Sequence, residues 1–346
     1  MINTMQDKTL RVIQVGIGGF GSSWAELARQ ATGVELAAVV DPSDAAREWA
    51  SSRLGLAEDQ IFESLDAALS AIPSDAVLVI TPPTTHHAVA TRALLAGRHV
   101  LVEKPLATTI AEAEALIATA KQQGRMLVVS QNYRFRSPAR TVQDVIARGE
   151  LGELVAVHGV CRRDTRALWP EDNFRYHMRH PYIVDMAIHH FDLIRALTGR
   201  NIVRIDARSW RVLDSPYTFE PAMAAILDLE GGVPVIYKGD WASSEPETSW
   251  NGEWTFIGTR GRLRWTGDID DAQKGHVEIF PLEGDPYAKA QDKLAEVDRA
   301  GSLQAFRRAV LTGEPAETQA SDNVFSLAAV LGCVESVEQC APVTLA

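Results

Sequence analysis

The feature that most constrains the fold of this 346-residue chain is a glycine-rich turn between an apolar strand and a helix. Residues 10–15 (LRVIQV) have the composition of a buried strand, residues 22–31 favour a helix, and Gly16, Gly18 and Gly21 lie between them. In a G-x-G-x-x-G turn the first glycine permits the tight bend, the second lets a pyrophosphate approach the backbone, and the third lets the helix pack closely. Because the free amides of a helix N-terminus attract anions, the turn predicts a dinucleotide site on an α/β sheet.

The second strand of this pattern points to the ribose of the cofactor. It covers residues 34–40 and ends at Asp41, where a carboxylate accepts hydrogen bonds from ribose hydroxyls. The same carboxylate repels the 2′-phosphate of NADP, by about 4 kcal/mol for unit charges about 4 Å apart. Ser43 and Arg47 are close enough in sequence to soften this repulsion, but we expect NAD rather than NADP. The expected cofactor-binding residues of this region are Gly16, Ile17, Gly18, Gly19, Phe20, Gly21 and Asp41.

Strand and helix patterns alternate from residue 10 to about residue 130. Strands are expected at 10–15, 34–40, 75–80, 98–103 and 126–130, and helices at 22–31, 43–54, 64–71, 84–96 and 108–123. Alternation at this spacing predicts a doubly wound parallel sheet of the Rossmann type, in a domain of residues 1–130.

After residue 130 strands dominate, and short glycine-containing turns such as 230–232 and 259–261 favour antiparallel hairpins. Strands are expected at 153–161, 201–212, 222–230, 233–241, 252–258, 261–265 and 276–281. Helices are expected at 137–148, 183–198, 286–299, 302–312 and 321–338. We therefore expect residues 131–346 to form an α+β domain with a large, open, mostly antiparallel sheet, so that the whole chain belongs to the α/β class. One face of that sheet must be covered by its own helices or by another subunit, which suggests a homo-oligomer, dimer or tetramer, formed through the sheet.

A second ligand signal lies in residues 97–106 (GRHVLVEKPL), where an apolar strand ends in Glu103, Lys104 and Pro105. The carboxyl ends of parallel strands face the ligand crevice. Pro105 removes a backbone donor and disfavours helical dihedrals at Lys104. We therefore expect the Lys104 amine to project from a stiff turn into a binding site.

The segment 183–197 is apolar almost all round, which predicts a buried helix, yet it contains Asp185, His189, His190 and Asp192. Asp185 and His189 are four residues apart and share a face, and Asp192 lies one turn further on the same side. Buried ionisable groups are costly unless they are paired or used. A carboxylate beside an imidazole raises the imidazole pKa toward the range useful for proton transfer.

Two other interpretations of this helix stay open. The Asp185–His189 pair could only fix helix packing. Alternatively, Asp185 with His189 or His190 could ligate a metal, together with His86 or His87, since histidine and carboxylate at helical spacing can bind zinc. No cysteine or second carboxylate–histidine helix completes such a site, so we expect no metal.

The segment before this helix is rich in groups that bind hydroxyls or an anion. Aromatic faces suit sugar rings, although sheet packing or a subunit interface explains tryptophans in this region equally well. Candidate substrate-binding residues are Arg163, Asp164, Trp169, Tyr176, His177 and, in the helix itself, His190.

Composition excludes several classes of partner. The net charge of −11 argues against nucleic acid and anionic membrane surfaces. No apolar run reaches the length of about 18 residues that a transmembrane helix needs, and Met1–Lys8 lacks the apolar core of a signal peptide. Cys161, Cys333 and Cys340 show no paired spacing, which fits a reducing cytoplasm.

Taken together, these motifs resemble the glucose–fructose oxidoreductase / inositol dehydrogenase (Gfo/Idh/MocA) family over nearly the whole chain. The motifs are Gly16-Ile17-Gly18-Gly19-Phe20-Gly21, Thr81-Pro82-Pro83-Thr84-Thr85-His86, Glu103-Lys104-Pro105, Gln131-Asn132-Tyr133-Arg134-Phe135 and Asp185-Met186-Ala187-Ile188-His189, with the C-terminal pattern from Ser302 to Ser336.

The resemblance implies NAD(P)-dependent hydride transfer to or from a hydroxyl-bearing carbon of a sugar, cyclitol or related polyol. It implies a catalytic set of Lys104, Asp185 and His189, all three in contact with substrate, and a cis peptide bond between Lys104 and Pro105. It also adds cofactor-binding residues at Thr81, Pro82, His86, Glu103, Lys104 and Gln131.

The mechanism implied places nicotinamide between the strand ends and the helix 183–198. His189 would take the hydroxyl proton as hydride leaves, Lys104 would stabilise the charge on the oxygen, and Asp185 would orient His189 or bind a neighbouring hydroxyl. The chain departs from the family at residues 180–184 and at Ala187, where glycines are common, so the approach to the helix is expected to be bulkier.

Two other functions remain open at this point. A non-catalytic dinucleotide-binding regulator would use the same fold, but it has no need of a base such as His189. An NAD-dependent glycoside-cleaving enzyme with recycled cofactor would oxidise its substrate only transiently. The reaction direction is also open, since a ketone reductase runs the same chemistry in reverse.

Overall fold

The computed structural model describes residues 8–345, which form two compact units; the expectation about a signal peptide falls largely outside this range. The first unit consists of the chain up to Gln131 together with Arg299–Val324, and the second of Asn132–Asp298 and the chain from Phe325 onward. The division expected from the sequence assigned all of 131–346 to the second domain. The structure instead returns 299–324 to the first unit, because Leu303 and Phe306 lie in its core and Arg307 donates to the Gly33 carbonyl at 2.8 Å.

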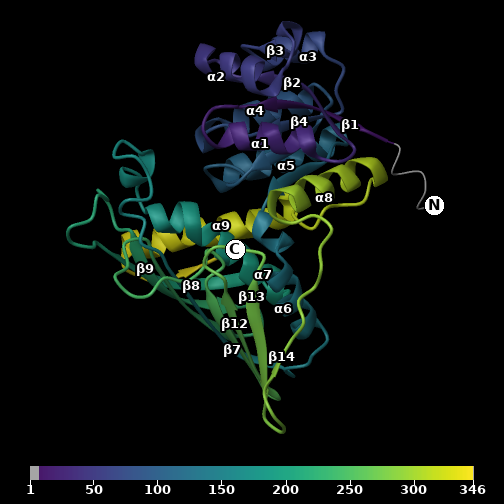
Figure 1. Ribbon diagram of the computed structural model, residues 1–346. Coiled ribbons are helices and arrows are strands. Elements are labelled where there is room, and N and C mark those ends of the chain that lie inside the picture. The colour runs from purple at the N-terminus through teal and green to yellow at the C-terminus, as the bar shows by residue number, and fades with distance from the viewer. Residues whose placement is uncertain (1–7, 346) are drawn as a thin grey trace. The chain divides into compact units, whose positions relative to one another are not determined.

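The first unit is built on a six-stranded parallel sheet with the order β3-β2-β1-β4-β5-β6 (Figure 1). Its strands are β1 (Leu10–Val15), β2 (Val34–Val40), β3 (Ile61–Phe62), β4 (Ala76–Val79), β5 (His99–Glu103) and β6 (Leu127–Ser130). Most are apolar on both faces, as a sheet covered on both sides requires. The strand order reverses between β1 and β4, and ligands of such sheets bind at the carboxyl ends beside that point.

Helices follow each of the longer strands in this unit. They are α1 (Phe20–Gln30), α2 (Asp44–Trp49) with a π-helical turn η2 (Ala50–Leu54), η3 (Glu58–Gln60), α3 (Leu65–Ala71), α4 (Pro83–Leu95), α5 (Ile110–Gln123) and α8 (Asp298–Thr312). The expected doubly wound sheet is therefore confirmed, and the strands expected at 10–15 and 34–40 match β1 and β2 residue for residue.

The second unit contains a nine-stranded sheet with the order β14-β13-β12-β11-β7-β10-β9-β8-β15. Its strands are β7 (Leu154–Arg162), β8 (Ile202–Trp210), β9 (Ala222–Leu229), β10 (Val233–Asp240), β11 (Glu253–Gly258), β12 (Gly261–Gly267), β13 (Gly275–Pro281), β14 (Tyr287–Ala288) and β15 (Val343–Thr344). All neighbouring pairs are antiparallel except β7 and β10, which run parallel. The expectation of a large, mostly antiparallel sheet is thus confirmed.

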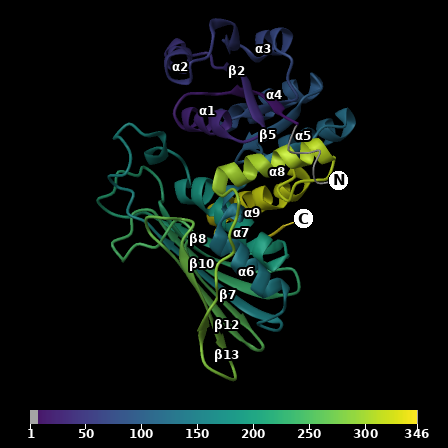
Figure 2. The same ribbon diagram turned by 45° about the vertical axis from the view of Figure 1, so that its right-hand side comes forward.

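One face of this sheet is covered and the other is open. The helical segments of the second unit are η4 (Asn132–Phe135), α6 (Ser137–Ala147), η5 (Phe174–Tyr176), η6 (Tyr182–Ala187), α7 (Ile188–Thr198) and most of α9 (Ala320–Gln339). Side chains from α6, α7 and α9 share one core with alternate residues of the strands, and Figure 2 shows α6 and α7 along that face. On the opposite face Ile226 and Ile236, directly paired across β9 and β10, are 52% and 54% exposed.

The helix expected at 286–299 is wrong. Tyr287 and Ala288 form β14 against β13 instead, and the Lys289 ammonium pairs with Glu150 at 2.6 Å. Helix α8 begins only at Asp298. Pairing with the sheet edge therefore overrides the local helical periodicity of this segment.

Helix α9 is the one helix among the described residues that is long and apolar enough to cross a membrane. Half of its apolar window is buried inside the protein, and Ala329, Val330 and Cys333 belong to the core of the second unit. These are the properties of a core helix.

Candidate active site

The glycine turn in the first unit has the geometry that its sequence predicts. Gly16 has φ 87°, and a Cβ there would lie 2.3 Å from the Ile80 carbonyl oxygen. A Cβ on Gly21 would lie 2.4 Å from the Gly16 carbonyl oxygen, so α1 can approach β1 only without a side chain at this position. A Cβ on Gly18 would meet no heavy atom of the described residues within 4 Å, which leaves its backbone accessible.

A buried glutamine that the sequence analysis missed holds this turn together. Gln14 on β1 donates from Nε2 to the carbonyl oxygens of Gly16 at 2.9 Å and Gly21 at 2.7 Å. Gln14 is fully buried, and a polar residue inside an otherwise apolar strand was the available signal. Gly19, the N-cap of α1, offers no side chain to the first amides of the helix, although the Gly21 amide donates to the Gly18 carbonyl at 2.9 Å. The positive end of the helix dipole favours a phosphate at this turn.

Asp41 lies beside the turn as expected for a ribose-binding carboxylate. Its Oδ2 accepts from the Ile17 amide and its Oδ1 from the Ser43 amide, both at 2.9 Å. A carboxylate has about four acceptor positions, so two remain for ribose hydroxyls. Arg47 donates to the Asp41 carbonyl at 2.7 Å and pairs with the Asp44 carboxylate, so its charge is already engaged.

His86 braces the turns that follow β4 and β5. Its Nδ1 lies 2.7 Å from the Pro105 carbonyl oxygen and its Nε2 lies 2.8 Å from the Thr81 carbonyl oxygen. Burial lowers the pKa of His86, while the two carbonyl acceptors act in the opposite direction. Because the side chain is fully buried and both ring nitrogens are occupied, we revise the expected direct cofactor contact of His86 to a supporting role.

The strand end at β5 presents Lys104 as the sequence indicated. The Lys104–Pro105 peptide bond is cis, and Lys104 is partly exposed. Glu103 is buried and accepts from Trp24 Nε1 at 2.9 Å and from the Lys104 amide at 3.0 Å. Burial raises the pKa of the Glu103 carboxyl. Glu103 thus ties the turn to α1. The remaining expected cofactor residues, Thr81, Pro82 and Gln131, follow β4 and β6.

In the second unit, Asp185 and His189 lie where a π-helical turn, η6, leads into α7. Such π-helical turns are frequent at functional sites. Asp185 Oδ2 accepts from Arg175 Nε at 2.6 Å. The His189 ring stacks on Tyr133, with centroids 4.3 Å apart, and the Arg136 guanidinium lies 3.2 Å from the Tyr133 ring centroid. His189 is 9% exposed.

Asp192 belongs to a structural cluster. Arg134 donates to its two carboxylate oxygens at 2.7 and 2.6 Å, and Ser326 donates to it at 2.7 Å. All three side chains are buried. The second acidic group of the helix, after Asp185, therefore stabilises packing.

The candidate substrate-binding residues between positions 163 and 177 each contact different neighbours. Arg163 donates to the Thr248 carbonyl at 3.0 Å and lies over Trp250. Asp164 pairs with Arg166 at 2.7 Å, which lowers the Asp164 pKa.

His177, Tyr176 and Trp169, the other candidate substrate residues of this segment, contact residues of the second unit. His177 Nδ1 contacts Thr218 Oγ1 at 3.1 Å. Tyr176, 1% exposed, donates to backbone carbonyls of its own loop, and Trp169 packs edge-on against it. We therefore revise Tyr176 and Trp169 from substrate contacts to loop packing.

His190 also requires a correction. It is fully buried, with Nδ1 2.5 Å from Tyr237 Oη and Nε2 3.0 Å from the Trp250 carbonyl oxygen, so neither ring nitrogen is available to a substrate. Arg175 was not selected from the sequence, although it lies in the arginine-rich segment before the helix. The expected bulk at 180–184 also acts differently, since Tyr182 and Ile183 are buried in the core.

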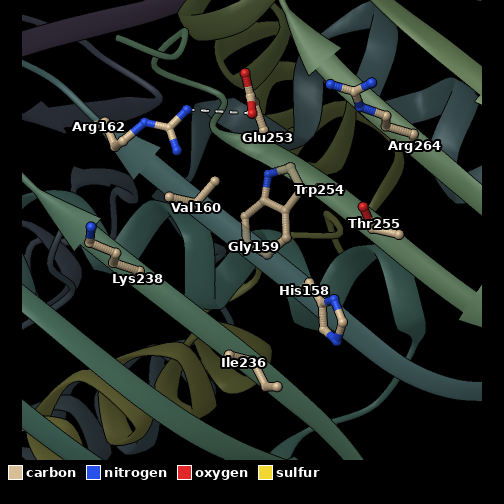
Figure 3. Close-up of a pocket in the computed structure, with 10 residues that line it drawn as sticks. All are labelled: His158, Gly159, Val160, Arg162, Ile236, Lys238, Glu253, Trp254, Thr255 and Arg264. Atoms are coloured by element: carbon tan, nitrogen blue, oxygen red, sulfur yellow. Dashed lines mark ion pairs between the residues drawn. The ribbon is translucent and has the colours of Figure 1, made fainter. Parts of the chain in front are cut away.

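The pocket on the open face of the nine-stranded sheet does not contain the candidate catalytic residues. Figure 3 shows a pocket over β7, β10, β11 and β12, where Arg162 and Glu253 pair at 3.6 Å; Ile236 and Lys238 line it from the face opposite Tyr237. Within residues 8–345, no group of three or more His, Cys, Asp or Glu side chains could hold a metal ion.

A doubly wound sheet whose glycine turn lies at the N-terminus of α1, beside a ribose-type carboxylate, is typical of NAD-binding oxidoreductases. Two family models match the chain: the oxidoreductase family with an NAD-binding Rossmann fold over residues 10–131, and the GFO/IDH/MocA C-terminal domain over residues 139–264. The chain belongs to the GFO/IDH/MocA family of NAD-dependent oxidoreductases.

Curated relatives and solved structures agree with this membership. The scyllo-inositol 2-dehydrogenase (NAD(+)) of Bacillus subtilis is 26% identical over 97% of this chain and 96% of its own length. The inositol 2-dehydrogenase of Leifsonia xyli is 30% identical over 64% of this chain and 65% of its own length. An inositol dehydrogenase homologue from Azotobacter vinelandii, solved with NADH and myo-inositol, has a TM-score of 0.83 at 20% identity, over 98% of both chains.

Proposed function

We propose that this enzyme oxidises a secondary hydroxyl of a sugar, cyclitol or related polyol to the ketone, with NAD as hydride acceptor. The observation that carries the proposal is the placement of Asp185 and His189 together on the turn between η6 and α7, next to a stacked tyrosine. The inositol dehydrogenases among its relatives support a polyol substrate.

The proposed roles follow from the chemistry of each side chain. His189 takes the proton of the reacting hydroxyl, and the Lys104 ammonium donates a hydrogen bond to the same oxygen as its negative charge develops. Asp185, which pairs with Arg175, binds a neighbouring hydroxyl. When bound, NAD supplies the carbon that accepts the hydride, so the substrate loses one hydride and one proton.

Arg163, Asp164 and His177 stay in the proposed substrate set, and Arg175 joins it. Thr81, Pro82, Glu103, Lys104 and Gln131 remain in the proposed cofactor set with the glycine turn and Asp41. Tyr182 and Ile183 point into the core and do not contact the substrate. The residues around Asp185 therefore determine which substrate shapes fit.

The test is a panel of sugars, cyclitols and sugar acids incubated with NAD⁺ and followed by nicotinamide absorbance. The proposal predicts net NADH formation with at least one polyol. If NAD⁺ binds in a calorimetric titration but no compound yields NADH, the protein is a dinucleotide-binding regulator and the proposal fails. Product release without net NADH would instead indicate glycoside cleavage with recycled cofactor.

We also propose that the enzyme is cytoplasmic and forms a homo-oligomer through the open sheet face. The exposed pair Ile226 and Ile236 supports the oligomer. Light scattering of the purified protein should give a dimer or tetramer. A monomer at micromolar concentration would contradict this part of the proposal.

A further inference from the structure

One buried hydroxyl on the sheet contacts both ends of the segment that carries Asp185 and His189. Tyr237 Oη on β10 lies 2.7 Å from Tyr182 Oη and 2.5 Å from His190 Nδ1. Tyr182 begins the π-helical turn before Asp185, and His190 directly follows His189. We propose that Tyr237 is a positioning residue for the reaction, whose hydroxyl fixes this segment and thereby the directions of the carboxylate and the imidazole.

The donors and acceptors of this network follow from its chemistry. The Trp250 carbonyl, 3.0 Å from His190 Nε2, can only accept, so Nε2 carries the proton. Burial lowers the pKa of His190 to about 4, so the ring is neutral at pH 7 and its Nδ1 accepts. Tyr237 must therefore donate to His190, and Tyr182 must donate to Tyr237. This chain of bonds has a single consistent direction.

The sheet also leaves the space that this arrangement needs. A Cβ on Gly239, two residues along β10 from Tyr237, would lie 1.9 Å from Cε1 of Tyr182. The Tyr237 ring stacks on Trp254 at 5.9 Å between centroids, and both residues pair in register with Gly159, which has no side chain between them. Stacking holds the Tyr237 ring independently of its hydroxyl. Removal of the hydroxyl alone should therefore leave the ring in place.

Tyr237 affects catalysis by keeping Asp185 and His189 in fixed positions. Tyr237 is fully buried, so it acts through the segment and not by contact with substrate. Displacement of reacting groups by about 1 Å can lower a rate by about 100-fold. This inference rests on the proposed function, since positioning matters only if Asp185 and His189 serve the reaction.

The deciding variant is Tyr237→Phe, which keeps the ring and removes the hydroxyl. We expect kcat for the polyol to fall by about tenfold or more, while NADH affinity is unchanged because the cofactor residues lie in the other unit. Amide hydrogen exchange should accelerate between residues 182 and 190 and stay unchanged in β1 and α1. Nitrogen NMR should show the His190 Nδ1 resonance shifting as its hydrogen bond is lost, while Nε2 keeps the proton that it donates to the Trp250 carbonyl.

The matched control is Ser336→Ala, which also removes a buried hydroxyl with two hydrogen bonds in the second unit. It should lower the melting temperature but leave kcat and exchange at 182–190 unchanged. Should Tyr237→Phe not fold, Tyr182→Phe removes one of the two contacts and is expected to give a smaller loss of the same kind.

Two results would overturn the inference. One is a Tyr237→Phe enzyme with wild-type kcat and wild-type exchange at residues 182–190. The other is an equal loss of kcat in Ser336→Ala, which would reveal general destabilisation. If the wild type oxidises no polyol, the proposed function fails, whereas the exchange and NMR measurements still report whether Tyr237 fixes the segment.

Discussion

Asp41 connects two parts of the first unit and, as proposed, binds the ribose with the same carboxylate. It accepts from the amides of Ile17 and Ser43, and so joins the glycine turn to the end of β2. In the proposed cofactor site its negative charge would also repel a 2′-phosphate, because Arg47 is engaged by Asp44 and by a backbone carbonyl. Preference for NAD is therefore linked to the conformation of the turn.

Asp41→Ala should reduce this preference and weaken the turn. We expect the ratio of NAD⁺ to NADP⁺ affinity to fall by up to about 1,000-fold, since about 4 kcal/mol of repulsion between two nearby charges is lost. Calorimetric titration of both dinucleotides measures the ratio. Glu48→Ala is the control, because this carboxylate lies exposed on the same helix, α2. An unchanged ratio in Asp41→Ala would show that another group selects the cofactor.

The elements differ in how strongly they depend on distant contacts. β1 and β2 are local apolar runs, and their bounds follow from sequence. β3, β14 and β15 are two residues long and exist only because a neighbouring strand pairs with them. The chain segment around Tyr287 shows the same effect, since edge pairing replaces a helix that periodicity favours.

The β1–α1 element depends on a buried amide that sequence reasoning overlooked. Gln14→Leu keeps the volume but removes the side-chain donor to the carbonyls of Gly16 and Gly21. Each unsatisfied buried group costs about 1–3 kcal/mol, so the free energy of unfolding should fall by a few kcal/mol and NADH should bind more weakly. Denaturant unfolding and a fluorescence titration measure the two effects. Wild-type values for both would mean that the turn holds its shape without Gln14.

The candidate site was predictable only in part. The residue types and spacing of Asp185 and His189 are visible in sequence, and so is the strand end at Lys104. The π-helical turn is not visible, because its apolar run reads as continuous helix. Arg175, which contacts Asp185, lies on η5, and Tyr237, which contacts His190, lies on β10. Only the fold reveals these contacts, because they join separate elements.

At the scale of the whole molecule, buried neutral histidines make stability depend on pH. His190 has a pKa of about 4 in the folded protein, lowered by burial from 6.5. The unfolded chain binds a proton near pH 6.5 and the folded chain does not until about pH 4. This contribution is therefore complete above pH 6.5 and is lost as the pH falls toward 4.

Replacement of His190 should remove this dependence. We expect the free energy of unfolding of the wild type to fall by up to about 3 kcal/mol more than that of His190→Gln between pH 7 and pH 4. Urea unfolding at a series of pH values measures the difference. Parallel pH profiles for the two proteins would show that His190 is not neutral in the folded state.

The most direct test of the account is the rate of NADH formation by His189→Ala with the best polyol of the panel. A general base contributes about 100-fold or more, so kcat should fall by at least that factor while NADH affinity stays at the wild-type value. His158→Ala, on the open face of the sheet, should keep the wild-type rate. A near-normal rate in His189→Ala would contradict the assignment of His189 as the proton acceptor.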